Sequence, residues 1–133
     1  MNLFYNTIVF VKDIEKSRYF YESIIGLKVE QAYDSIVFFE NHFVIHDKQK
    51  IYKTVFDGKL QAETIERSDI LIYFETDDVN RSYQHIVSLN VPIIHSIKKQ
   101  EWGQQVFRFY DPDNHIVEIG EAMHLDYLKQ QAI

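Results

Sequence analysis

The sequence has 133 residues, a formal net charge of −6, and contents of 46% hydrophobic and 15% aromatic residues. This is a globular composition, with many rings available to pack a core or line a pocket. Because the basic residues are scattered and the longest basic run is Lys98-Lys99, neither nucleic acid nor an anionic membrane is expected as a partner.

The chain contains no cysteine, which excludes disulfides, thiolate ligands and a cysteine nucleophile. No apolar run approaches the roughly 18 residues that span a bilayer, and the N-terminus lacks a basic segment followed by an apolar core. We therefore expect a cytoplasmic protein without a membrane segment.

The first part of the chain predicts a strand, a helix and three further strands. Residues 3–11 are rich in strand-forming side chains. Asp13 is a helix N-cap signal, apolar residues keep helical spacing through Ile25, and Gly26 is placed to end the helix in the left-handed conformation. The three strands that follow are expected at residues 27–32, 35–40 and 43–47.

Residues 48–68 are polar and mixed, and they form the predicted connection to a second module. A connection of this length is unusual inside a compact domain, which favours some ordered structure within it, over a cavity.

The same order of elements then recurs. Residues 69–76 predict a strand, Asp78 caps a second helix, and Asn90 ends it. The remaining predicted elements are a strand at 91–97 that contains Pro92, a hairpin of 106–110 and 116–120 around the turn 111–114, and a C-terminal helix at 122–131.

This repetition predicts an α+β fold built from two βαβββ modules, with Asp13-Ile14-Glu15-Lys16-Ser17 recurring as Asp78-Val79-Asn80-Arg81-Ser82. The modules are expected at 1–47 and 69–121, followed by the helical tail at 122–133. Helices cover one face of each module, and the opposite faces together form a curved eight-stranded sheet around a cleft.

Glu118 is the unusual residue of the final strand, because a carboxylate stands between apolar neighbours in mid-strand. Burying it without a partner is costly, so it is expected to meet a partner, bind a metal or face a wet cavity. An exposed position on a solvated face is the other interpretation.

Several stretches resemble the vicinal oxygen chelate superfamily, which includes glyoxalase I, extradiol dioxygenases, fosfomycin-resistance enzymes and bleomycin-binding proteins. The resemblance covers nearly the whole chain. It is carried by Val11-Lys12-Asp13, Ser17 with Phe20-Tyr21, Gly26-Leu27, the run from Glu75 to Val79, Trp102-Gly103, and Asp111-Pro112-Asp113-Asn114-His115 with Glu118.

The resemblance implies a divalent metal (zinc, nickel, iron or manganese) in metal-dependent members, with ligands from the first and last strands of each module. The corresponding positions here are Asn6, His46, Leu71 and Glu118. Leu71 cannot bind a cation and Asn6 offers only a weak carbonyl oxygen, so His46 and Glu118 are the two strong candidates. A catalytic metal usually takes three protein ligands, and no bound cofactor is therefore our first expectation.

His46 and Glu118 have a second interpretation as a hydrogen-bonded pair, which acts either as a general base or as a structural contact. The other expected cleft residues are Asn6, Tyr73, Trp102, Arg108 and Tyr110. Arg108 can bind an anionic group or pair with Glu118. Trp102 is either a lid over a ligand or a core or interface anchor.

Two classes of function follow. The first is a small-molecule-binding protein that sequesters an amphipathic or aromatic ligand, as bleomycin-resistance proteins do. The second is a metal-dependent lyase or dioxygenase of glyoxalase I or extradiol type, in which Glu118 and His46 take part in catalysis. A vestigial cleft is a third possibility, and a homodimer is the expected assembly.

Overall fold

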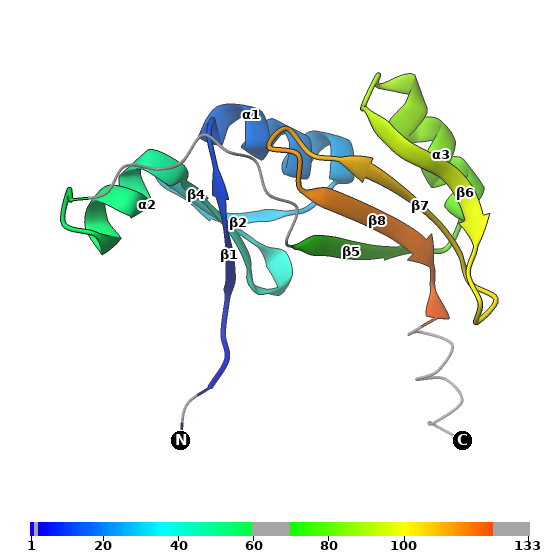
Figure 1. Cartoon of the computed structure of the whole chain (residues 1–133), viewed down its shortest axis with the longest axis horizontal. Coiled ribbons are helices and arrows are strands. Elements are labelled where there is room, and N and C mark those ends of the chain that lie inside the picture. Colours follow the sequence, from blue (N-terminus) through cyan, green and yellow to red (C-terminus); the bar gives the residue numbers. More distant parts are fainter. Residues whose placement is uncertain (2, 60–69, 124–133) are drawn as a thin grey trace. The chain divides into compact units, whose positions relative to one another are not determined.

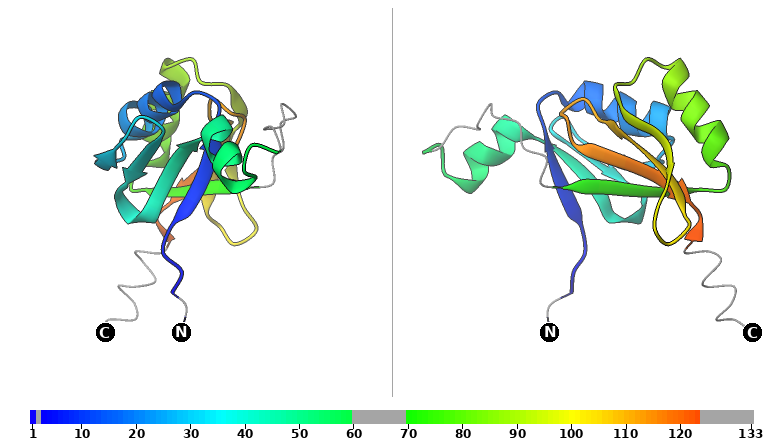
Figure 2. Two further views of the ribbon diagram at one scale, coloured as in Figure 1. Left: turned by 90° about the vertical axis from the view of Figure 1, so that its left-hand side faces the viewer. Right: turned by 45° about the vertical axis from the view of Figure 1, so that its right-hand side comes forward.

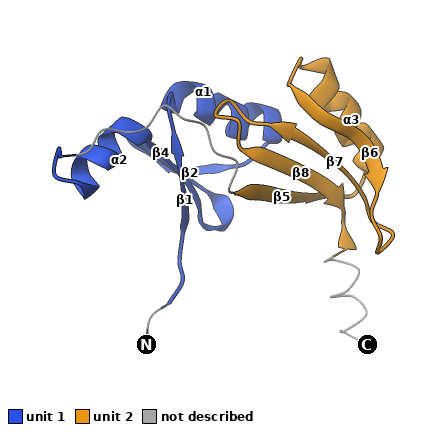
Figure 3. Cartoon of the chain, viewed as in Figure 1, with its two compact units in different colours: residues 1–66 blue, residues 67–133 orange. Residues whose placement is uncertain are grey.

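The computed structural model describes residues 1, 3–59 and 70–123. The chain divides into two compact units, Met1–Glu66 and Arg67–Ile133, which are coloured separately in Figure 3. Each unit holds one four-stranded sheet. The expected α+β fold with two βαβββ modules is confirmed.

In the first unit, strand β1 (Thr7–Val11) leads into helix α1 (Ile14–Tyr19), which continues as the π-helical segment η1 (Phe20–Ile25). The sheet has the order β1-β4-β3-β2, and β1 pairs in parallel with β4. The remaining elements of this unit are β2 (Val29–Ala32), β3 (Ile36–Phe39), η2 (Glu40–His42), β4 (Phe43–Asp47) and α2 (Lys48–Val55).

The second unit repeats this topology with the strand order β5-β8-β7-β6, and β5 pairs in parallel with β8. Figures 1 and 2 show α3 lying along one face of this sheet. Its elements are β5 (Leu71–Thr76), α3 (Val79–Ser88), β6 (Ile93–Lys99), β7 (Gln105–Tyr110) and β8 (Ile116–Glu121).

Alternation along the strands determines which face of each sheet is buried against the helix. In the first unit Tyr21 of η1 packs on Phe39 and Phe43, with ring centroids 6.1 and 4.9 Å away. In the second unit Tyr83 of α3 packs on Phe107 at 5.1 Å. The face opposite α1 or α3 is called the open face of its sheet.

The predicted helix ends are confirmed. The side chains of Asp13 and Asp78 accept hydrogen bonds from the backbone N–H three residues later, which caps α1 and α3. Gly26 and Asn90 adopt positive φ values of 95° and 57°, as the sequence predicts for residues that end a helix.

Four of the eight strands are shorter at their ends than predicted, and the largest difference is at the N-terminus. β1 begins at Thr7 rather than Leu3, so Asn6 lies just before the strand. Part of the predicted connection is ordered, because α2 occupies Lys48–Val55 and is capped by Asp47. Asp69 and the predicted helix 122–131, apart from its first two residues, lie outside the described residues.

Among the residues that the structure describes, no helix is both long enough and apolar enough to cross a membrane.

Candidate functional site

The open face of the second sheet carries a row of polar side chains, one from each strand. Tyr73 of β5 stands opposite Glu118 of β8, Glu118 stands opposite Arg108 of β7, and Arg108 stands opposite His95 of β6. Paired residues on neighbouring strands project to the same side of a sheet. These four side chains therefore line one continuous strip of the open face.

Glu118 and Arg108 form an ion pair within this row. Arg108 Nε donates to Glu118 Oε1 at 2.7 Å, and Glu118 is only 8% exposed. This pairing resolves the puzzle of a carboxylate in mid-strand, because the guanidinium compensates the charge that β8 buries. Of the two roles predicted for Arg108, the pairing with Glu118 is the one observed.

The guanidinium also connects the row to β6 and the turn after it. Arg108 Nη1 lies 3.0 Å from His95 Nε2, and Nη2 donates to Gln100 Oε1 at 3.4 Å. His95 Nδ1 lies 2.8 Å from the Ser96 carbonyl, which can only accept. His95 therefore donates through Nδ1 and accepts from Arg108 through Nε2, which is one neutral tautomer.

A second network lies beside the row and is centred on Gln104, which is 4% exposed. Its Nε2 donates to the Tyr73 hydroxyl and to the Glu121 carbonyl, each at 2.8 Å. Its Oε1 accepts from the indole N–H of Trp102 at 2.8 Å. Tyr73 in turn donates to Glu75 Oε2 at 2.7 Å, so β5 is tied to the loop that carries Trp102.

Tyr73 is held as a neutral phenol. Burial, followed by the hydrogen bond to Glu75, raises the pKa of Tyr73 from 10.0 to about 12 and outweighs the opposite effect of Gln104. The folded state thus retains this proton more strongly than the unfolded chain does. The associated stability is present below pH 10.0 and is lost as the pH rises towards 12.

We expect a titration of phenolate absorbance to show one tyrosine with a midpoint near pH 12, and this component to be missing from Tyr73→Phe. The same titration of Tyr33→Phe, which removes a tyrosine from the first unit, is expected to retain it. Loss of a component near pH 10 from Tyr73→Phe would contradict the assignment.

An apolar row runs next to the polar one on the same open face. Leu71 of β5, Ile116 of β8 and Tyr110 of β7 stand opposite one another in turn, and Leu71 is 45% exposed. The open face of the second sheet is therefore amphipathic, with an apolar strip beside a polar strip.

Asn6 lies in the first unit, where it lines a pocket of about 380 Å³. Tyr5, Phe38 and His42 are among the other lining residues, and the Tyr5 ring packs edge-on against His42 with centroids 4.4 Å apart. This pocket is lined by residues of the first unit, and the place of Asn6 in a ligand cleft stays a prediction. A pocket of this volume is large enough for a small organic molecule.

His46 lies at the other end of the same sheet. It stands opposite Phe10 of β1 and Ile36 of β3, and its Nδ1 lies 3.2 Å from the Asp47 carbonyl. Since β1 aligns Thr7 with Phe43, Asn6 and His46 are separated by about 13 Å along the strands. The structure does not bring these two candidate ligands together.

The strand registers show that the two equivalences suggested by the sequence repeat, Asn6 with Leu71 and His46 with Glu118, do not hold together. Tyr73, two residues after Leu71, stands opposite Glu118. Ile8, two residues after Asn6, stands opposite Val44. If Asn6 corresponds to Leu71, Val44 corresponds to Glu118; if His46 corresponds to Glu118, Ile8 corresponds to Leu71.

Comparison with known proteins assigns the chain to a family. A family model for the glyoxalase-like domain matches residues 4–124, which is most of the chain. The chain belongs to the glyoxalase-like domain family. The resemblance to the vicinal oxygen chelate superfamily is thereby confirmed.

Three proteins illustrate the similarity of this glyoxalase-like domain to known sequences and structures. A solved protein of unknown function from Agrobacterium tumefaciens is 41% identical and has a TM-score of 0.84, with 92% of this chain and 96% of that chain covered. The uncharacterized protein YraH of Bacillus subtilis is 26% identical over 115 residues, with 82% and 90% covered. A lactoylglutathione lyase from Agrobacterium tumefaciens shares the fold at 19% identity and a TM-score of 0.71, with 92% and 95% covered.

The metal that metal-dependent relatives use is not matched by the residues of this glyoxalase-like domain. Either alignment leaves two of the four implied ligand positions aliphatic, namely Leu71 together with Val44 or Ile8. The Glu118 carboxylate accepts a hydrogen bond from a guanidinium at 2.7 Å, and this guanidinium would repel a divalent cation. Within either unit, the described residues include no group of three His, Asp or Glu side chains that could hold a metal ion.

The remaining predicted cleft residues have definite places in the second unit. Tyr73, Arg108 and Tyr110 lie on the open face of the second sheet, and their place in a ligand cleft stays a prediction. Trp102 is 60% exposed, so it is not an anchor in the core of its unit. Sequence reasoning missed Gln104 and treated His95 as isolated. Strand alternation places Gln104 on the face of Arg108, which is the one signal that could have identified it.

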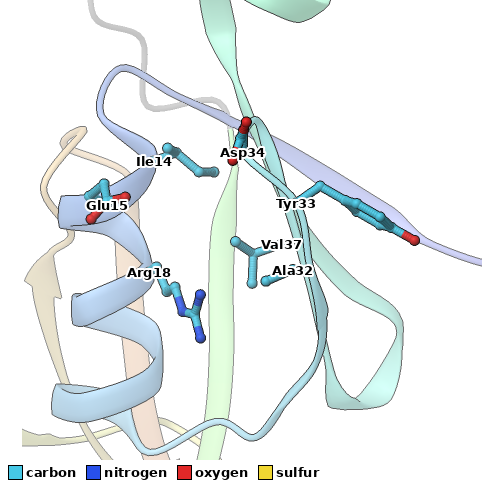
Figure 4. Close-up of a pocket in the computed structure, with 7 residues that line it drawn as sticks. All are labelled: Ile14, Glu15, Arg18, Ala32, Tyr33, Asp34 and Val37. Atoms are coloured by element: carbon cyan, nitrogen blue, oxygen red, sulfur yellow. The ribbon is translucent and has the colours of Figure 1, made fainter.

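Another pocket, of about 400 Å³, lies beside α1 in the first unit. Figure 4 shows Arg18 extending from α1 towards the hairpin of β2 and β3, where Ala32, Asp34 and Val37 line the opposite wall. Arg18 also pairs with Glu22 at 3.4 Å, on the exposed side of the helix. No sequence motif predicted this pocket.

Proposed function

We propose that this glyoxalase-like domain binds a small amphipathic or aromatic molecule, and that binding does not depend on a metal. The observation that carries the proposal is the amphipathic open face of the second sheet. Its apolar row offers Leu71, Ile116 and Tyr110, and its polar row offers Tyr73, Glu118, Arg108 and His95. A ligand with an apolar body and a polar edge matches both rows.

The charge state of the polar row supports an uncharged or weakly polar ligand edge. The Arg108 guanidinium and the Glu118 carboxylate neutralise one another at 2.7 Å, and His95 accepts a hydrogen bond from Arg108 through Nε2. A ligand that carried a full charge would have to compete with this internal ion pair. Hydroxyl, amide and ring nitrogen groups can instead add hydrogen bonds at its edge.

The alternative predicted from the sequence, a metal-dependent lyase or dioxygenase, has weaker support. It requires a full ligand set, and Leu71 together with either Val44 or Ile8 supplies no donor atom at two of its positions. Sequestration in the manner of a bleomycin-resistance protein requires only a shaped, amphipathic surface, so it is the function that we propose. A homodimer remains our proposal for the assembly.

Calorimetric titration with a panel of aromatic alcohols, phenols and amides tests the proposal. We expect saturable binding of at least one compound, with the same affinity in the presence of EDTA. Leu71→Asp places a carboxylate in the apolar row and is expected to weaken binding at least about tenfold. Val87→Asp is the matched control, because Val87 is equally exposed at 44% but lies on the outer side of α3.

Two results would contradict the proposal. One is binding that appears only after zinc, nickel, iron or manganese is added. The other is an equal loss of affinity in Leu71→Asp and Val87→Asp, which would indicate a general effect of charge rather than a ligand on the open face.

A further inference from the structure

Trp102 is both exposed and held in place by a hydrogen bond. Its side chain is 60% exposed, yet its indole N–H is held by Gln104 Oε1 at 2.8 Å. An exposed tryptophan that is tied in one orientation keeps a large apolar ring available to a ligand at little further cost in conformational entropy.

The orientation of the Gln104 amide is set by three partners. Two acceptors, the Tyr73 hydroxyl and the Glu121 carbonyl, lie 2.8 Å from Nε2. The Trp102 indole is a donor, so it selects the oxygen end of the amide. If the amide turned over, its NH₂ group would face the indole N–H of Trp102 and its oxygen would face the Glu121 carbonyl. Both contacts would be unfavourable, so the amide keeps its orientation and the indole keeps its acceptor.

Gly120 supplies the space for this arrangement. A Cβ atom at position 120 would lie 2.5 Å from Gln104 Nε2 and 3.1 Å from Val106 Cγ1. Gly120 lies two residues after Glu118 on β8, so its missing side chain leaves room on the open face. The amide of Gln104 occupies that room, beside the polar row.

We propose that Trp102 is an aromatic-binding wall of the ligand site, and that Gln104, admitted by Gly120, is the residue that positions it. The inference rests on the proposed function and narrows the ligand class to molecules that present a flat aromatic ring. Trp102 provides a face for ring packing, and the neighbouring Tyr73 hydroxyl network provides a polar edge for a hydroxyl or amide on that ring.

The test uses 2-naphthol and its saturated counterpart decahydro-2-naphthol, which share a hydroxyl and a similar size but differ in aromaticity. Trp102 is the single tryptophan of the chain, so its indole N–H gives one assignable signal in a proton–nitrogen correlation spectrum. We expect 2-naphthol to shift this signal saturably and to bind several-fold more tightly than the saturated alcohol.

Trp102→Leu is expected to weaken 2-naphthol binding about tenfold, as truncation of an aromatic anchor does at binding sites. Trp102→Phe keeps a ring and is expected to retain part of the affinity. Tyr19→Leu is the matched control, because Tyr19 is 62% exposed on α1 of the first unit, and it is expected to bind as the wild type does.

Gln104→Met and Gly120→Ala test the positioning role. Both are expected to speed hydrogen exchange of the indole N–H and to weaken 2-naphthol binding several-fold, because the indole loses its acceptor. Gly103→Ala serves as the comparison, since a Cβ there meets nothing within 4 Å and strains only the turn, where φ is 94°.

Equal affinity of the wild type for the two alcohols, or unchanged 2-naphthol binding by Trp102→Leu, would overturn the inference. Binding of other panel compounds by a wild-type protein that ignores both alcohols would overturn it as well, while leaving the proposed function intact. Failure of the wild type to bind any compound of the panel would instead refute the proposed function and the inference with it.

Discussion

Replacing Arg108 with methionine is expected to lower the free energy of unfolding by about 3 kcal/mol, because it leaves the carboxylate of Glu118 in a nearly buried position without its partner. Glu118 is 8% exposed, and the ion pair has a separation of 2.7 Å. Urea unfolding followed by circular dichroism measures the loss. Trp102 fluorescence reports on the second unit in the same experiment.

The double variant Arg108→Met with Glu118→Met separates the cost of an unpaired charge from the value of the pair. A buried ion pair can often be exchanged for apolar side chains of similar volume with little loss of stability. We therefore expect the double variant to regain most of the stability that Arg108→Met loses. A double variant that is less stable than Arg108→Met would show that the ion pair itself stabilises the sheet strongly.

Phe107→Ala is expected to cost about 4 kcal/mol, since it removes a fully buried ring from the helix-facing side of the second sheet. Phe107 packs edge-on against Tyr83 and stacks with Phe109 at 5.6 Å, so the cavity is enclosed by rings that cannot easily collapse into it. Urea unfolding again provides the measurement.

Ile94→Ala is the control for this prediction, because Ile94 lies on β6 of the same sheet but is exposed. Its expected effect is below about 1 kcal/mol. Similar losses for Phe107→Ala and Ile94→Ala would contradict the assignment of Phe107 to the buried core of the second unit.

Local chemistry made much of the fold predictable. Asp13 and Asp78 have short side chains that accept from backbone N–H groups, and each stands directly before a run with helical spacing, so each predicts a helix start. The hairpin turn at Asp111 was equally predictable from the sequence. Its carboxylate accepts from the backbone N–H groups of Asp113 and His115 at 2.9 and 2.8 Å, which closes the turn.

The register between distant strands could not be derived in this way. A pairing of β1 with β4 depends on which apolar side chains fit against the helix, and a shift by two residues keeps every side chain on its own face. The sequence repeat matches Asn6 to Leu71 and His46 to Glu118, whereas the observed pairings of Ile8 with Val44 and of Tyr73 with Glu118 differ by two residues from that combination. Alternation alone cannot distinguish these two registers.

The polar networks were only partly predictable for a different reason. Arg108 and Glu118 are close in the hairpin, so their pairing follows from local geometry. Gln104 and Tyr73 are brought together across the sheet by a parallel pairing between β5 and β8. A neutral amide carries no charge pattern that would reveal such a partner in advance.

Together, these observations describe a glyoxalase-like domain with a duplicated fold, for which we propose a function without a metal. Leu71 and either Val44 or Ile8 supply no donor atom at two of the four positions that the resemblance implies, and Arg108 pairs with the carboxylate of Glu118. The amphipathic open face of the second sheet remains as the surface that we propose to bind a ligand.

Equilibrium dialysis of the chelator-treated protein against zinc, nickel, iron and manganese, with metal content measured by mass spectrometry, tests this account most directly. We predict that each metal is retained at a small fraction of one ion per chain, and that Glu118→Gln retains as little as the wild type. Retention of one ion per chain by the wild type, lost in Glu118→Gln or His46→Ala, would contradict the account.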